Sequence, residues 1–368
     1  MSLPRSASSP PTSASTSLGG NRLRRGASGA LLGLLAILPG PPLRETLAAP
    51  APVEVLRSVS GIPPFLAGEF ESASGFARRP DGSSLVFDRR RHRVYSIDAA
   101  RTAVTPLVEI GYETGRVLQP TAFDVADTGD FIVADAPGRR PRVSVFQSSG
   151  QVLNTFSLAA SESPRVIVDN FVLNGIAAAR YTGTTILVNQ PERGVLVTEY
   201  SITGAVQRQI GVLRRTGHEA DPDVHLAFNT ALPLPTREGG LYVVFLSGPP
   251  MFRKYSPGGN LEFERVIQGR EIDPLVLRLP TQWPRRTIDD GTYPMVLPMV
   301  RTAAVDRAGR LWVAMPTSHV YVFDSDGEKV RTLQLIGAGV LTPTSMWFAR
   351  DGHLLVTPGL YEFAPPNG

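Results

Sequence analysis

The feature that most constrains this chain is a motif that recurs six times. In each copy an apolar segment leads into a polar turn with glycine, and a second apolar segment, a short polar loop and a third apolar segment follow. The first glycine turns fall at Gly82, Gly129, Gly183, Gly239, Gly309 and Gly352. Consecutive turns are 43 to 70 residues apart. A repeat of this length indicates one small structural unit per copy, with the longer gaps carrying insertions.

The six copies consist of short segments that are typical of β-strands. They span residues 75–98, 120–156, 174–211, 226–267, 301–335 and 345–363. Val143–Phe146 and Val320–Phe323 are rich in β-branched and aromatic residues, as strands are. No stretch of the repeats keeps a helical apolar period over three turns. We therefore predict an all-β chain folded as a six-bladed β-propeller, each blade made of four antiparallel strands.

The last copy lacks a fourth strand, because the chain ends soon after Phe363. A propeller with an unfinished blade would leave an open sheet edge. The segment Val53–Val59 lies upstream of the first copy and has a strand-like pattern. We predict that this N-terminal strand closes the last blade, with Phe65–Phe70 as the other candidate.

Short motifs within the copies resemble those of the NHL-repeat family. An Asp-x-x-Gly turn spans Asp306–Gly309, Val-Ala-Asp closes a second strand at Val133–Asp135, and Arg-Val opens a third strand at Arg93 and at Arg142. The resemblance covers roughly residues 72–363 and implies a six-bladed propeller. We also expect Asp88 and Asp135 to cap the ends of second strands and to pair with Arg93 and Arg142.

The N-terminus has the order of a secretory signal. A basic stretch at Arg22–Arg25 precedes the apolar run Gly29–Leu38, and small residues follow at Thr46, Ala48 and Ala49. We predict a disordered extension with a signal in residues 1–48, a linker with the closing strand in residues 49–71, and the NHL-like propeller in residues 72–368. The protein is then exported, to the periplasm, the cell envelope or the extracellular space. If the leader is not cleaved, it anchors the protein to the membrane.

Charge and cysteine content exclude several classes of function. The chain has 37 basic and 33 acidic residues. Five of the basic residues and one of the acidic residues lie in residues 1–48, which leaves 32 of each in the rest of the chain. A folded domain with no net charge lacks the positively charged surface that nucleic-acid binding needs, so we expect no nucleic-acid partner. The chain has no cysteine, which rules out disulfides, thiolate metal sites and cysteine nucleophiles.

The longer connections of this pattern all fall on one face of a propeller, which we call the loop face. They are residues 88–93 and 135–142, which join second to third strands, and the insertions 211–223 and 269–300. Such loops carry function more often than short hairpin turns do. They hold Arg89, Arg90, Arg91, Arg139, Arg140, Arg214, Arg215, Arg285 and Arg286. These arginines, with Trp283 as an anchor, predict binding of a protein, peptide or glycan partner that carries an anionic group. Solvated or locally paired charges, and a Trp283 folded onto the propeller rim, are the alternatives.

A second hypothesis is a metal-dependent hydrolase or lyase at the mouth of the channel. Its candidate ligands for a divalent metal are His218, Glu219, Asp221, Asp223 and His225. Their spacing matches no known metal motif, and a polar surface loop is the favoured alternative. No catalytic motif is present, so we expect no other cofactor and predict no catalytic residue. We expect an almost wholly apolar channel wall, with Asn229 as its one strongly coordinating group.

Overall fold

A computed structural model describes residues 52–158, 165–168, 171–173, 176–288 and 291–364. The chain divides into two units, residues 1–49 and residues 50–368, and all the described residues belong to the second. Strands dominate this unit, as predicted. Its α-helices, within the described ranges, are α1 (Pro64–Ala67), α2 (Pro222–Phe228) and α3 (Asp273–Val276). The predicted leader lies outside the described residues.

Four of the sheets are antiparallel meanders of four consecutive strands. The first comprises β2 (Ala73–Arg78), β3 (Ser84–Asp88), β4 (Arg93–Ile97) and β5 (Val104–Val108), and the second β6 (Ala122–Val125), β7 (Phe131–Asp135), β8 (Arg142–Phe146) and β9 (Val152–Ser157). The third comprises β12 (Ala179–Tyr181), β13 (Thr185–Asn189), β14 (Val195–Ser201) and β15 (Val206–Val212), and the fourth β16 (Ala231–Pro235), β17 (Leu241–Phe245), β18 (Met251–Tyr255) and β19 (Leu261–Val266). Each meander overlaps one of the first four predicted repeats, although β5 lies beyond residue 98, where the first repeat was predicted to end.

The fifth and sixth repeats are joined in one eight-stranded sheet. It contains β22 (Thr302–Val305), β23 (Leu311–Ala314), β24 (Val320–Phe323) and β25 (Lys329–Ile336), followed in space by β1 (Glu54–Gly61), β28 (Tyr361–Phe363), β27 (Leu354–Thr357) and β26 (Ser345–Phe348). The first half of β1 pairs in parallel with β25, and its second half pairs antiparallel with β28 from Ser58 to Gly61. The prediction for Val53–Val59 is thus met only in part. Ser58 pairs with the last repeat as predicted, whereas Glu54–Arg57 pair with the fifth repeat. The other candidate, Phe65–Phe70, holds part of α1 instead.

The hairpin between the first and second strands of the fifth repeat depends on glycine and on the aspartate of the repeat motif. Gly309 has φ of 78° and its amide donates to the Asp306 carbonyl at 3.0 Å. The Asp306 carboxylate accepts the Arg310 amide at 2.9 Å and the buried Trp312 indole N–H at 2.9 Å. An L-residue with a Cβ is strained at positive φ, so this turn requires glycine.

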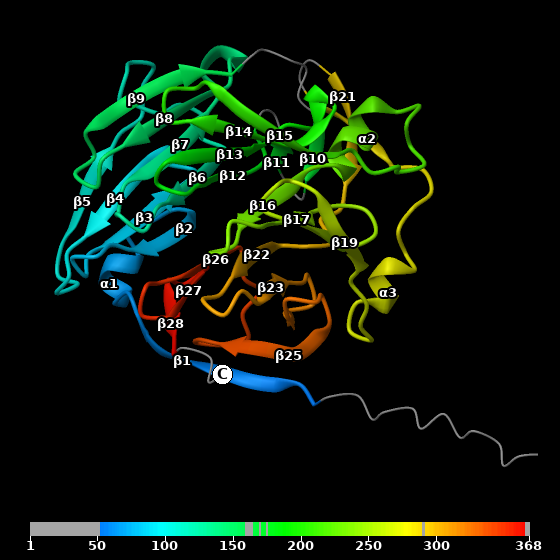
Figure 1. Ribbon diagram of the computed structural model, residues 1–368. Coiled ribbons are helices and arrows are strands. Elements are labelled where there is room, and N and C mark those ends of the chain that lie inside the picture. The colour runs from blue at the N-terminus through cyan, green and yellow to red at the C-terminus, as the bar shows by residue number, and fades with distance from the viewer. Residues whose placement is uncertain (1–51, 159–164, 169–170, 174–175, 289–290, 365–368) are drawn as a thin grey trace, which may run out of the picture. The chain divides into compact units, whose positions relative to one another are not determined.

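The sheets are arranged like the blades of a propeller (Figure 1). The first strand of each repeat contacts that of the next, in the order β2, β6, β12, β16, β22, β26 and back to β2. Figure 1 shows these strands toward the centre, with β5, β9 and β25 toward the outside. Six apolar clusters fill the space between neighbouring sheets; one of them packs Ile132 and Val143 of the second sheet against Ile186 and Val188 of the third. The core is thus a series of packed interfaces between sheets.

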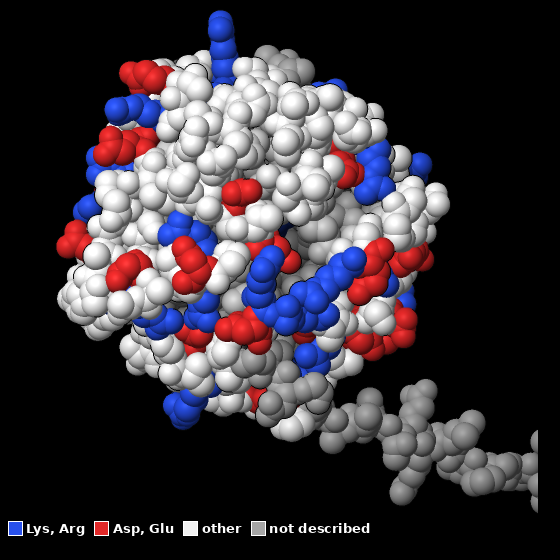
Figure 2. Space-filling model, turned by 60° about the vertical axis from the view of Figure 1, so that its left-hand side comes forward, with Lys and Arg blue, Asp and Glu red and all other residues white. Residues whose placement is uncertain are grey.

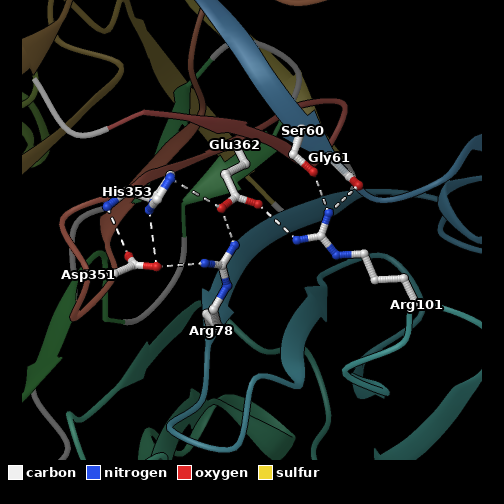
Figure 3. Close-up of polar contacts among 7 residues, drawn as sticks. All are labelled: Ser60, Gly61, Arg78, Arg101, Asp351, His353 and Glu362. Carbon is white, nitrogen blue, oxygen red and sulfur yellow. Dashed lines mark hydrogen bonds and ion pairs between the residues drawn. The ribbon is translucent and has the colours of Figure 1, made fainter.

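Ionic contacts join the first sheet to the last one and to β1 (Figure 3). Glu362 of β28, whose side chain is 7% exposed, pairs with Arg78 of β2 and, at 2.8 Å, with Arg101 of the β4–β5 turn. Arg101 also donates to Ser60 Oγ at 2.6 Å and to the Gly61 carbonyl at 2.8 Å. Burial alone raises the pKa of Glu362, but the hydrogen bonds and charges of the two guanidiniums outweigh it and hold this pKa below its usual value. These ion pairs and hydrogen bonds therefore link the first sheet to the last sheet and to β1.

The predicted aspartate caps are present, with one change of partner. Asp135 at the end of β7 pairs with Arg142 through two hydrogen bonds of 2.7 and 2.9 Å, which confirms that prediction. Asp88 at the end of β3 instead accepts backbone N–H groups, from Glu71 at 2.7 Å and from Arg90 at 3.1 Å among others. Both carboxylates hold the loop that follows their strand.

One four-stranded sheet lies outside the repeats and was not predicted. It is formed by β10 (Val166–Val168) and β11 (Phe171–Leu173) with β20 (Arg285–Ile288) and β21 (Gly291–Val296). Ile167 pairs in parallel with Met295 across more than a hundred residues of sequence. A local pattern cannot reveal such a pairing, so the segment 269–300 was expected to be a loop. The insertions therefore form an ordered accessory layer with α2.

No helix among the described residues is long and apolar enough to cross a membrane.

Candidate functional site

A cavity lies where the first strands of all six repeats converge. It has a volume of about 260 Å³ and is lined by residues of β2, β6, β12, β16, β22 and β26. An adjoining cavity of about 290 Å³ shares Arg89, Leu246, Arg301 and Thr344 with it. The adjoining cavity is also lined by Ser72 and Ser247, which lie just before a first strand and just after a second strand, so it opens toward the loop face. We call the two together the loop-side cavity.

Four charged residues line the loop-side cavity: Arg89, Asp124, Arg180 and Arg301. Arg180 in β12 pairs with Asp124 in β6 at 3.0 Å, and Asp124 also accepts the Tyr181 amide at 2.7 Å. Burial raises the pKa of Asp124, while the charge of Arg180 and these hydrogen bonds oppose the rise. Three of the four charged lining residues are arginines.

Arg89 follows directly after β3, and Arg301 comes directly before β22. Burial lowers the pKa of Arg89, yet a guanidinium starts so far above neutrality that it stays protonated. The remaining wall is rich in hydroxyl groups, from Thr302, Thr344 and Ser345 among others, and includes the Trp347 indole. Guanidiniums beside hydroxyls are donors suited to carboxylate or phosphate oxygens.

The expectation of an almost wholly apolar channel wall is wrong at Asp124, Arg180 and Arg301. The wall residues expected from the sequence were Thr121–Phe123 and Ile176–Ala178. All of these except Ile176 do line the cavity, but the wall continues to Asp124 and Arg180. The strands that line the cavity are Ala122–Val125 and Ala179–Tyr181. The sequence did contain a signal for such wall residues, namely a charged residue inside a short apolar strand. An ionised group is rarely buried without a function or a partner.

Asn229, the expected coordinating group, does not line this cavity. Its side chain is fully buried, accepts the Arg214 amide at 2.8 Å and donates to the His225 carbonyl at 3.0 Å. Asn229 therefore secures the end of α2.

The predicted loop arginines do not form one cluster. Among those whose side chains are described, Arg89 lines the loop-side cavity. Arg90 lies 3.5 Å from Glu71, and Arg91, Arg140, Arg215 and Arg286 are exposed. The Arg139 side chain lies outside the described residues. On the face seen in Figure 2, acidic side chains alternate with basic ones, and several basic side chains border a hollow near the middle.

Arg214 is buried and holds the insertion that contains α2. It donates to the backbone carbonyls of Phe228 at 2.9 Å, Pro249 at 3.1 Å and Ser247, and it lies 4.4 Å from the centre of the Phe245 ring. Burial, with a smaller contribution from the charge of Arg253, lowers the pKa of Arg214 to about 10. These contacts assign Arg214 a structural part in the fold.

Trp283 is folded inward, which was one of the two alternatives for it. Its ring meets the Phe228 ring edge-on at 5.5 Å in a cluster with Val166 and Val296. Its indole nitrogen has no hydrogen-bond partner among the described residues. Arg285, two residues later, pairs with Asp221 at 2.6 Å. This part of the insertion packs against α2.

The residues of the metal hypothesis have other partners. Asp221 caps α2 through the Val224 amide, Glu219 accepts the Thr216 amide at 2.8 Å, and the His225 Nδ1 lies 2.8 Å from Thr216 Oγ1. The His218 ring packs edge-on against Phe228 at 5.2 Å, and Asp223 lies in the first turn of α2. Within the described ranges no group of three or more His, Cys, Asp or Glu side chains is placed to hold a metal ion.

Comparisons with known proteins identify no family. No protein-family model matches the chain, and no curated protein matches it. Two solved structures are similar to it at low identity. A protein of unknown function from Bacteroides caccae is 11% identical, with 77% of this chain and 81% of that one covered and a TM-score of 0.39. Kuenenia stuttgartiensis hydrazine synthase is 13% identical, with 78% and 93% covered and a TM-score of 0.43. Neither likeness is strong enough to support an argument about function.

Proposed function

We propose that this chain is an exported, NHL-like six-bladed β-propeller that acts as a binding module, and that its loop-side cavity takes an anionic group of a protein, peptide or glycan partner. The observation that carries the proposal is the convergence of Arg89, Arg180 and Arg301 on one cavity. Arginine is the residue best suited to carboxylate and phosphate groups, because its planar fork offers several N–H donors in a fixed geometry.

Six blades are supported by the cyclic order of contacts between first strands and by the pairing of β1 with β28. Export is supported by the basic, apolar and small-residue order of residues 22–49. Ligands commonly bind where several elements converge on a concave, partly apolar cavity.

Binding fits this donor set better than catalysis does. Arginine keeps its proton at neutral pH, so Arg89 and Arg301 cannot exchange one with a substrate. Asp124 is the carboxylate among the charged lining residues, and its contact with Arg180 and the Tyr181 amide engages both of its oxygens. The site therefore offers positive charge and hydrogen-bond donors in fixed positions.

The proposal is tested by calorimetric titration of the full chain with inorganic phosphate, glutarate and galacturonate at low ionic strength. We expect saturable binding of at least one anion, weakened about tenfold or more in Arg301→Ala, which corresponds to about 1.4 kcal/mol or more. Arg286→Ala is the matched control, because Arg286 is exposed in β20 and is not among the residues lining the cavity. Absence of binding to all three anions, or equal affinity in wild type and Arg301→Ala, overturns the proposal.

A further inference from the structure

A second cavity lies at the opposite end of the first strands, where the short hairpins turn. It has a volume of about 300 Å³, and its lining includes Arg237, Arg307 and Arg350. Each of these arginines belongs to the turn that joins the first strand of a repeat to the second. We call this the hairpin-side cavity.

The three arginines occupy the same position in three repeats. Each stands two residues before its turn glycine, at Gly239, Gly309 or Gly352. The three first strands that lead into these turns, β16, β22 and β26, contact one another in that order. Each turn is closed by a hydrogen bond of 2.9 to 3.1 Å from its glycine amide, so the backbone beneath each arginine is fixed.

The guanidiniums of these arginines remain available for a ligand. In the part of the chain that the structure describes, all three are exposed and none makes a hydrogen bond or an ion pair. The acids beside two of them are already engaged: Asp306 pairs with Arg310 at 2.8 Å, and Asp351 with Arg78 at 3.0 Å.

Apolar side chains also line the hairpin-side cavity. Val125, Tyr181, Val305 and Phe348 contribute to its lining. Tyr181 donates its hydroxyl to the Gly183 carbonyl at 3.1 Å, and the Phe348 ring is held edge-on against Trp312 at 5.3 Å. Apolar side chains and three exposed guanidiniums in one cavity favour a ligand with an apolar body and more than one negative group, since each part then meets its complement. Asp127 and Asp306 are carboxylates in the same lining. Asp306 is paired with Arg310, and Asp127 disfavours negative groups near its own edge.

We propose that the hairpin-side cavity is a second binding site, separate from the loop-side cavity, for a small organic dianion with an aromatic or aliphatic body. Two negative groups engage arginines of adjacent repeats at once, which a monoanion of the same shape cannot do. Because the two cavities lie at opposite ends of the first strands and share no arginine, each site is expected to bind without the other.

The test is titration of the full chain with isophthalate and, for comparison, benzoate, which has the same ring and one carboxylate. We expect isophthalate to bind at least tenfold more tightly than benzoate, and Arg307→Gln to weaken its binding at least tenfold. Arg278→Gln and Arg301→Ala should bind isophthalate like the wild type, because Arg278 is exposed and lies outside both cavities and Arg301 lines the other one. Thermal denaturation verifies that each variant is folded.

Three outcomes overturn the inference: no saturable binding of isophthalate, equal loss in Arg278→Gln and Arg307→Gln, or loss in Arg301→Ala with none in Arg307→Gln. The third outcome would place the dianion in the loop-side cavity and would be consistent with the proposed function. Isophthalate binding lost only in Arg307→Gln, with phosphate and galacturonate failing to bind, supports this site and removes the other; glutarate is an aliphatic dianion and is expected to bind here as well.

Discussion

Replacing Glu362 by glutamine should weaken the junction between the first and last sheets without changing the shape of the side chain. The carboxylate is 7% exposed and lies between Arg78 and Arg101, whose side chains are 18% and 26% exposed (Figure 3). Removing one partner of a fully buried ion pair costs about 3–5 kcal/mol. Arg78 keeps Asp351 and Arg101 keeps Ser60, and both guanidiniums are partly hydrated. We therefore expect a loss of about 2 kcal/mol in the free energy of unfolding.

Urea unfolding followed by the fluorescence of the three tryptophans measures this loss. Urea is uncharged and does not screen the ion pairs, as guanidinium chloride would. In a thermal scan the same change lowers the midpoint by about 3 °C, given an unfolding entropy of about 2.1 cal/mol/K per residue. Glu328→Gln is the control, because Glu328 is 72% exposed and lies 3.8 Å from Arg265. Such an exposed pair contributes about 0–1 kcal/mol.

The loss should also depend on pH. The pKa of Glu362 is lower in the folded chain than its usual value. Its contribution is therefore complete above the pKa of an ordinary glutamate, about 4.3, and disappears as the pH falls through the folded pKa. The difference in stability between wild type and Glu362→Gln should be full at neutral pH and shrink in acid. Equal stability at pH 7, or a difference that stays constant down to about pH 3, would refute this role for Glu362.

Two further predictions concern how the chain is held together. A chain that begins at Ile62 lacks β1 and exposes the edges of β25 and β28. We therefore expect it to aggregate or to melt at a lower temperature than a chain that begins at Pro52. Size-exclusion chromatography and thermal denaturation measure the two effects. Arg214→Met retains an apolar stem but loses three hydrogen bonds to carbonyls, and we expect it to cost about 3 kcal/mol in urea unfolding. Arg215→Met, at an exposed neighbour, should stay within about 0.5 kcal/mol of the wild type, and similar losses in the two variants would contradict the assignment.

The sequence by itself determined the repeat, the strands and the turns. Glycine at positive φ in each hairpin, and β-branched residues on either side, are local signals because each depends on the backbone of a few residues. The pairing of Asp135 with Arg142 could be predicted for the same reason, since one short loop brings the two residues face to face. The pairing of β1 with β28 followed from a missing strand, because an open edge in the last repeat needs a partner, whereas its parallel pairing with β25 was not predicted.

Only the tertiary structure decided which side chains meet. Arg89, Arg180 and Arg301 lie in or beside three different sheets. Arg180 lies two residues after the expected first strand of its repeat and Arg301 two residues before its own, so neither was predicted to line the wall. Arg214 and Arg215 are neighbours in sequence with the same charge, yet one is buried among carbonyls and the other is exposed. The parallel pairing of Ile167 with Met295 joins two insertions that no local pattern relates. Burial and convergence depend on how the sheets pack against one another, and this packing is a property of the whole chain rather than of any single repeat.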